Sequence, residues 1–235
     1  MMIRTALILI SLFVLAGCSN STRWFQTVTV EVETPGGIVS AASTYEVRLA
    51  TSTALYESIL RKKGFGYAIK GQATVLTLSS GHMVVALLHG NGSPASEPGK
   101  NGFEYLTAND VTYPEIDDTF LEMIGDIAPG TRAEIAPRDW PLIVVYQPGA
   151  SITQFDAVSG VDGPSLASLI AEGFRLKSIT VEKSSGPASA ITIDQIFPCL
   201  ADDDWRACRL NVFKGKYNTP RSVWRRESFL RRDVS

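Results

Sequence analysis

The sequence contains few of the residues that enzymes use for covalent or metal chemistry. Among 235 residues there are two histidines, His82 and His89, and three cysteines. The patterns Gly-x-Ser-x-Gly, Gly-x-x-x-x-Gly-Lys and Gly-x-Gly-x-x-Gly do not occur. The first pattern positions the nucleophile of α/β-hydrolases, and the other two bind phosphates. No nucleophile elbow, phosphate loop or dinucleotide fingerprint is therefore predicted, and no cofactor is expected.

The N-terminal apolar segment is too short to cross a membrane securely. It runs over residues 6–14, after the basic Arg4, whereas a bilayer core is about 30 Å thick. An abruptly polar stretch begins at Ser19. A basic start, a short apolar run and a small-residue end are typical of a cleaved secretory signal peptide.

The end of this leader, Leu15-Ala16-Gly17-Cys18, resembles the lipobox of bacterial lipoproteins. The resemblance implies cleavage before Cys18 and acylation of that cysteine, with fatty acids such as palmitate. The lipid bilayer would then be a partner. Because Ser19 and not aspartate follows the cysteine, the expected location is the outer membrane, facing the periplasm. Residues 18–23 would form a tether that reaches about 20 Å at most.

The expected organisation is a signal peptide (1–17), a lipidated tether (18–23), a single globular α+β domain (24–220) and a basic C-terminal tail (221–235). Cys199 and Cys208 remain after lipidation of Cys18, in a compartment that permits disulfides. We expect these two cysteines to be bridged. Asp202-Asp203-Asp204, between them, lacks the spacing of a calcium loop and is interpreted as a solvated turn.

Hydrophobic periodicity predicts mostly strands. Residues 27–34 alternate, with valines at 28, 30 and 32 on one face, and the Pro35-Gly36-Gly37 turn leads to a second strand over 43–50. Further strands are expected over residues 72–78, 83–88, 131–136, 142–146 and 175–183. The pairs 72–78 with 83–88 and 131–136 with 142–146 are interpreted as strand pairs, the second pair around Pro137-Arg138-Asp139.

Two short helices are predicted among these strands. The first covers 114–127, with an apolar stripe that includes Ile124 and Ile127, and ends at Pro129-Gly130. The second covers 164–172, capped by Asp162 and ended by Gly173. Residues 55–63 are ambiguous. Hairpins interrupted by two helices predict an α+β fold with a mainly antiparallel sheet.

One segment invites a catalytic interpretation. His89-Gly90-Asn91-Gly92 follows an apolar strand and resembles the oxyanion-hole segment of α/β-hydrolases. The other parts of that pattern are missing. His82 and His89, placed on one strand, would point to opposite faces, and no partner ligands cluster with them, so no metal site is predicted.

The C-terminal segment is strongly basic. Residues 206–235 contain nine Lys or Arg against two Asp or Glu, a net charge of +7. Two hypotheses concern Arg225, Arg226, Arg231 and Arg232: they contact an anionic surface, or they pack on the acidic body of the domain. Nucleic acid is not an expected partner in this compartment.

The leading functional hypothesis is an envelope lipoprotein that acts as a binding or assembly module, without catalytic residues. The alternative is an envelope hydrolase with a site near His89 and the 90–102 loop, or with two carboxylates that are distant in sequence.

Overall fold

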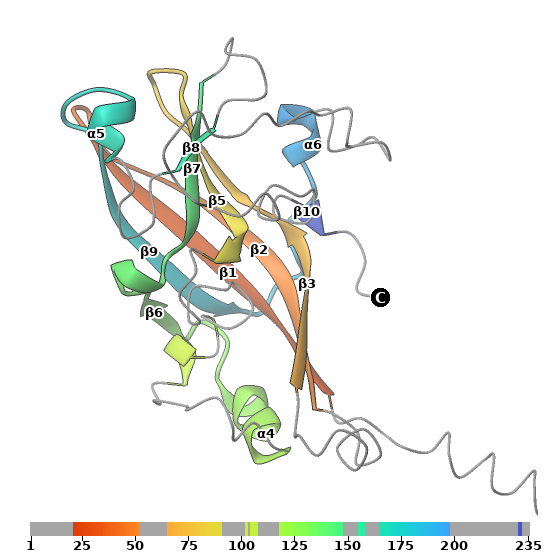
Figure 1. The fold of residues 1–235 in the computed structure, drawn as a ribbon. Coiled ribbons are helices and arrows are strands. Elements are labelled where there is room, and N and C mark those ends of the chain that lie inside the picture. Colours follow the sequence, from red (N-terminus) through yellow and green to blue (C-terminus); the bar gives the residue numbers. More distant parts are fainter. Residues whose placement is uncertain are drawn as a thin grey trace, which may run out of the picture.

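The computed structural model describes residues 21–51, 65–90, 102, 104–107, 118–147, 155–157, 165–197 and 230–231. It consists mostly of antiparallel β-sheet with a few short helices, as the hydrophobic periodicity predicts (Figure 1). The larger sheet has the order β10-β3-β2-β1-β9-β6. Its strands are β1 (Ser21–Thr34), β2 (Gly37–Thr51), β3 (Phe65–Gln72), β6 (Arg132–Glu134), β9 (Arg175–Ser184) and β10 (Leu230–Arg231).

The smaller sheet has the order β4-β5-β7-β8 and packs against the larger one. Its strands are β4 (Thr74–Thr77), β5 (Met83–Gly90), β7 (Pro141–Tyr146) and β8 (Phe155–Ala157). Side chains from both sheets form one core between them. The second face of the smaller sheet packs against Ile193 and Phe197, which come from or directly follow α6 (Ile193–Ile196). Because both faces are covered, β7 is buried at every residue and its sequence is a continuous apolar run.

The β1–β2 hairpin forms the centre of the larger sheet. The two strands pair without interruption from Ser21↔Ala50 to Thr34↔Gly37. Val28, Val30 and Val32 are buried, which confirms the predicted face of β1. The second strand begins at Gly37, six residues before the predicted start, so the hairpin is longer than its apolar pattern indicates.

The predicted strand over 72–78 is wrong in its extent, because the chain changes sheets inside it. β3 ends at Gln72 in the larger sheet, and β4 begins at Thr74 in the smaller one. A bend at Gly71, whose φ is +155°, precedes the change. Most of β3 has no counterpart among the predicted strands. The predicted pairing of the next two strands is confirmed, since β4 pairs with β5.

The second predicted strand pair is wrong. Strands β6 and β7 exist near the predicted positions, but they belong to different sheets: β6 pairs with β9, and β7 pairs with β5 and β8. The 3-10 helix η2 (Pro137–Asp139) joins them. What resembles a hairpin turn in the sequence is therefore a connection between two layers. The predicted strand over 175–183 is confirmed as β9, which pairs with β1.

Both predicted helices are present in part. In α4 (Asp118–Asp126), Ile124 is buried; residues 108–117 lie outside the described part of the chain. Lys183 Nζ donates to the carbonyls of Ile124 and Gly125, both at 2.9 Å, so a cation meets the negative end of the helix. Burial lowers the pKa of Lys183, and the nearby Asp126 carboxylate opposes this shift.

The second helix, α5 (Leu166–Leu169), is shorter than predicted and has a different cap. Ser165 Oγ accepts from Ser168 N at 3.3 Å, whereas the predicted cap, Asp162, lies outside the described residues. Leu166 is buried. The predicted stop at Gly173 is wrong, because the helix ends at Leu169 with Ile170 as its C-cap, and Gly173, with a φ of +87°, lies in the turn that follows. α6 has no counterpart among the predicted helices.

The bend at Gly71 generates the first prediction. A Cβ atom there would lie 2.4 Å from Tyr45 Cβ and 3.0 Å from Tyr45 Cα, in the neighbouring strand. Gly71→Ala should therefore lower the free energy of unfolding by about 3 kcal/mol or more. The matched control is Gly125→Ala in α4, where a Cβ meets nothing within 4 Å and alanine should add up to about 1 kcal/mol. Urea unfolding measures both; equal effects would contradict the close approach.

Candidate binding site

A pocket of about 530 Å³ lies at the end of the molecule where the β1–β2 hairpin turns. This volume falls in the range of small-molecule sites. Its walls come from the end of β1, from α5, from the start of β9 and from Trp140. The lining residues described are Glu33, Trp140, Ser165, Leu166, Ala167, Gly173, Phe174, Arg175 and Leu176. Figure 1 shows α5 beside the hairpin turn.

The wall of the pocket is mostly apolar, and its charged groups are already paired. Leu166 and Phe174 are buried core residues, and Trp140 and Leu176 pack against the same core. Arg175 Nε donates to Glu33 Oε2 at 3.0 Å across the β1–β9 pair. Both side chains of this ion pair are well exposed, so it adds little stability but leaves the arginine open to solvent.

The turn after α5 sits on the hairpin turn. Gly173 adopts a left-handed φ of +87°, and a Cβ there would lie 3.1 Å from Pro35 Cγ. This close approach joins two segments that are far apart in sequence and closes one side of the pocket.

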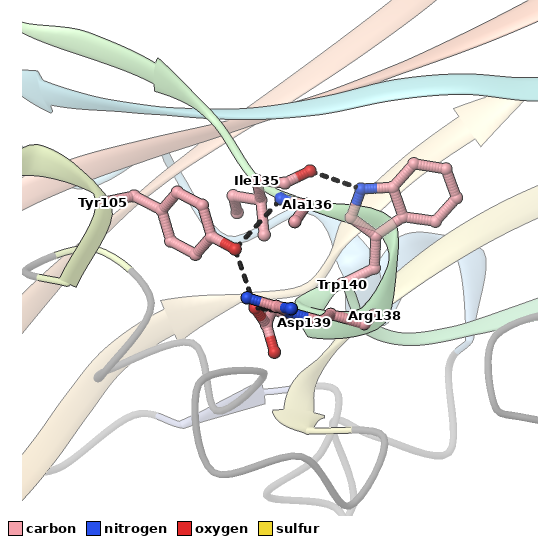
Figure 2. Close-up of polar contacts among 6 residues, drawn as sticks. All are labelled: Tyr105, Ile135, Ala136, Arg138, Asp139 and Trp140. Carbon is pink, nitrogen blue, oxygen red and sulfur yellow. Dashed lines mark hydrogen bonds and ion pairs between the residues drawn. The ribbon is translucent and has the colours of Figure 1, made fainter. Parts of the chain in front are cut away.

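Trp140 is held by the connection between β6 and β7. Its indole Nε1 donates to the Ile135 carbonyl at 2.9 Å, and it directly follows η2 (Figure 2). Pro137 pre-sets the backbone at the first position of the 3-10 turn, and Asp139 N donates to Ala136 O at 2.8 Å. The orientation of the tryptophan therefore depends on this turn.

A buried carboxylate fixes the turn from the other side. Tyr105 Oη donates to Asp139 Oδ2 at 2.7 Å and accepts from Ala136 N at 3.1 Å. Arg138 Nε lies 3.3 Å from the same Oδ2 atom. In Figure 2 the rings of Tyr105 and Trp140 lie on either side of the Ile135–Ala136 backbone. Burial raises the pKa of Tyr105, and the hydrogen bond to Asp139 raises it further, so the phenol stays a neutral donor at pH 7.

The structure describes two of the candidate residues in the hydrolase hypothesis, and neither lines the pocket. His89 is half-buried on β5, whereas His82 lies in the turn before that strand, with Nδ1 3.1 Å from Ser80 Oγ. The expectation that both occupy one strand is wrong. Residues 91–101 lie outside the described part of the chain.

The other predicted site residues cannot be placed within the described structure. Cys18, Cys199, Cys208, Arg225, Arg226 and Arg232 all lie outside it. Arg231 is described by its backbone alone, in β10.

Two further properties concern the described residues only. They contain no group of three or more His, Cys, Asp or Glu side chains that could hold a metal ion. None of the helices described is both long enough and apolar enough to cross a bilayer.

Comparisons with protein-family models, with curated proteins and with solved structures found no match to this chain.

The sequence does not predict the pocket, because the walls of the pocket come together only through long-range strand pairing. Leu176 belongs to the predicted strand over 175–183, Phe174 precedes that strand, and Trp140 directly follows the predicted turn Pro137-Arg138-Asp139. The sequence does contain one indication of this part of the pocket. A tryptophan beside a proline-containing turn between two strands indicates a place where an aromatic side chain needs a polar partner.

The Tyr105 network generates the second prediction. Tyr105→Phe removes the donor to a buried carboxylate and the acceptor of Ala136 N, which should cost about 1–3 kcal/mol. Because the folded-state pKa lies above the ordinary value of 10.0, the stabilisation by Tyr105 is fully present below pH 10 and is lost as the pH rises through the folded-state pKa. The wild type should therefore lose more stability than the variant above pH 10 in thermal unfolding.

Arg138→Gln is the control for this prediction. Its side chain is largely exposed, so losing the ion pair should cost less than about 1 kcal/mol. An equal loss in both variants, or an identical alkaline pH profile for wild type and Tyr105→Phe, would contradict the proposed role of the phenol.

Proposed function

We propose that this chain is a bacterial envelope lipoprotein, anchored through acylated Cys18, whose domain acts as a binding module. The pocket at the hairpin turn is the site where a ligand binds. The anchor half of the proposal rests on the lipobox resemblance, and the binding half rests on the pocket.

The course of β1 supports a separation between the anchor and the pocket. β1 begins at Ser21, three residues after Cys18, and ends at Thr34, next to the pocket residue Glu33. A strand rises about 3.3 Å per residue, so the two ends of β1 are about 43 Å apart. A protein held at the start of β1 keeps the pocket at the far end, where ligands away from the bilayer reach it.

The chemistry of the pocket wall selects the class of ligand. Trp140, Phe174 and Leu176 offer apolar surface, and Arg175 supplies a solvent-exposed cation beside it. Burial of an apolar body against such a wall is favourable by about 25 cal/mol per Å². Because Arg175 is already paired with Glu33, which lines the same pocket, the apolar wall selects the ligand, and the preferred ligand is a small molecule with an apolar body.

The C-terminal segment is proposed to belong to the domain. The backbone of β10 pairs with β3 through Leu230↔Gln72 and Arg231↔Gly71. A segment that pairs with the edge of the larger sheet is not a free tail. This pairing favours packing of the basic segment on the domain over binding to an external anionic surface.

The third prediction tests the anchor. Cys18→Ala should abolish incorporation of radiolabelled palmitate, because the acylated thiol is removed, and should leave the precursor uncleaved before residue 18. Immunoprecipitation after labelling measures the first effect, and mass spectrometry of the N-terminus measures the second. Ser19→Ala is the control and should still be labelled. A wild-type N-terminus without acyl mass would refute the anchor but leave the pocket untouched.

The fourth prediction tests the pocket, using the unlipidated chain from Ser19 and 8-anilinonaphthalene-1-sulfonate, a probe with apolar rings and an anionic group. Ala167 is exposed on α5 and lines the pocket, so Ala167→Trp should narrow it and weaken saturable binding. Ala171→Trp changes an exposed alanine outside the lining and should bind as the wild type does. Fluorescence titration measures both. Equal binding by the two variants would refute the site.

A further inference from the structure

One part of the hairpin has an open edge. On the side away from β1, strand β3 pairs with β2 only from Glu46 to Thr51. Next along β2, Thr44 N donates to Ser189 Oγ at 2.9 Å, and Thr44 O accepts from Ser189 N at 2.8 Å. No strand within the described part of the chain pairs with this side of residues 37–42.

The alternation of a strand identifies which backbone groups face this open edge. Thr44 and Ser189 exchange bonds on the edge side, so the N–H and C=O groups of residue 44 point outward. The β1–β2 register is regular over the whole hairpin, and the same orientation recurs at every second residue. Ile38, Ser40 and Ala42 therefore point their backbone groups outward as well, and all three residues are exposed.

This edge lacks the features that prevent strands from pairing. The segment Ile38-Val39-Ser40-Ala41-Ala42 contains no charge and no proline. Ile38 and Val39, 55% and 37% exposed, are the large hydrophobic residues that stand exposed among those described. Natural sheets protect an open edge with lysine, proline or a bulge, and an unprotected apolar edge is a template for another strand.

We propose that the edge from Ile38 to Ala42 binds the same edge of a second copy of this chain. The two strands run antiparallel, with Ser40 of both copies at the two-fold axis. In this register Ile38 faces Ala42 of the other copy, and both residues point their backbone groups toward the partner. The three outward-facing residues of each strand then exchange six backbone hydrogen bonds.

The self-complementarity of the segment favours a second copy over an unrelated peptide. The outward groups are symmetric about Ser40, and the large Ile38 lies opposite the small Ala42, so side chains on each face do not collide. The free length is limited by the hairpin turn at one end and by Ser189 at the other. A five-residue pairing is small, so the dimer is weak and exchanges rapidly.

The fifth prediction is a crosslinking experiment on the full-length, detergent-solubilised protein. Directly opposite residues of a hydrogen-bonded antiparallel pair have Cα atoms about 5.5 Å apart, within the range of about 4.4–6.8 Å that a disulfide spans. Mild oxidation of Ser40→Cys should therefore trap a covalent dimer. Non-reducing peptide mapping should find residue 40 linked to residue 40, which distinguishes this bond from any that involves Cys199 or Cys208.

Two control variants make the register specific. Residue 38 is exposed as residue 40 is, but in Ile38→Cys the two copies of residue 38 are four residue steps, about 13 Å, apart along the strands and should not crosslink. Ala42→Pro, added to Ser40→Cys, removes an outward N–H that the hairpin itself does not use, and should abolish the dimer. Circular dichroism checks that this double variant keeps the β-sheet spectrum of Ser40→Cys; if it does not, Ala42→Lys replaces it.

Each other result overturns the proposal. Equal crosslinking at positions 38 and 40 would mean random collision of exposed cysteines. Stronger crosslinking at 38 would mean another register. A disulfide from residue 40 to a different protein would mean that the edge receives a foreign strand, and a monomer that resists crosslinking at high concentration would mean that the edge stays open.

Discussion

The bend at Gly71 is the constraint on which the rest of the structure depends. There the chain leaves β2 and passes within three residues from the larger sheet to the smaller one. The backbone approaches Tyr45 so closely that a side chain would overlap it, and only glycine fits. Gln72, the next residue, binds both layers: its backbone carbonyl accepts from Ser43 Oγ at 3.1 Å, and its Oε1 accepts from Thr192 N and Ile193 N. The side-chain amide of Gln72 thus holds the start of α6. Ile193 of this helix packs against the second face of the smaller sheet, so the packing of that face begins at the crossover.

The crossover also explains why the hairpin has an open edge. A third strand that followed β2 to its start would cover Ile38 to Ala42, but β3 has already turned away at Gly71. Ser189 fills the position beside Thr44, and the structure describes no strand beyond it. The open edge of β2 and the arrangement in two sheets thus both follow from the bend at Gly71. A change that straightened the bend would destabilise the contact between the sheets and cover the edge at the same time.

The sequence predicts local periodicity well and long-range partners poorly. The alternation of Val28, Val30 and Val32 identified β1 because one face is buried and the other is not, and the Pro35-Gly36 turn placed its partner beside it. The run over 72–78 resembles one strand because its residues are buried on both sides of the crossover, so hydrophobicity does not change where the chain changes sheets.

The predicted pairing of β6 with β7 is wrong for a related reason: a short connection is compatible with a hairpin and with a step between layers. The long-range pairing of β6 with β9 and of β7 with β5 decides between them, and Asp139 in the connection bonds to Tyr105, more than thirty positions away. The pocket was missed because its walls meet through the pairing of β1 with β9, which no local pattern encodes.

The position of Glu33 connects these observations. It lies one residue before the end of β1, it pairs with Arg175 at the pocket, and it faces Ile38 directly across the hairpin. The pocket and the open edge therefore share one end of β1, on opposite sides of the same strand pair, with β9 on one side and the exposed edge of β2 on the other. An antiparallel dimer through that edge would bring the two pockets toward its centre and carry the two starts of β1 to its ends. If both copies carry the lipid anchor proposed at Cys18, about 43 Å of strand on each side would let both tethers reach one flat surface only with the long axis of the dimer along it. In the proposed dimer, an upright orientation of each proposed anchored copy would be excluded, and the two pockets would face along the surface.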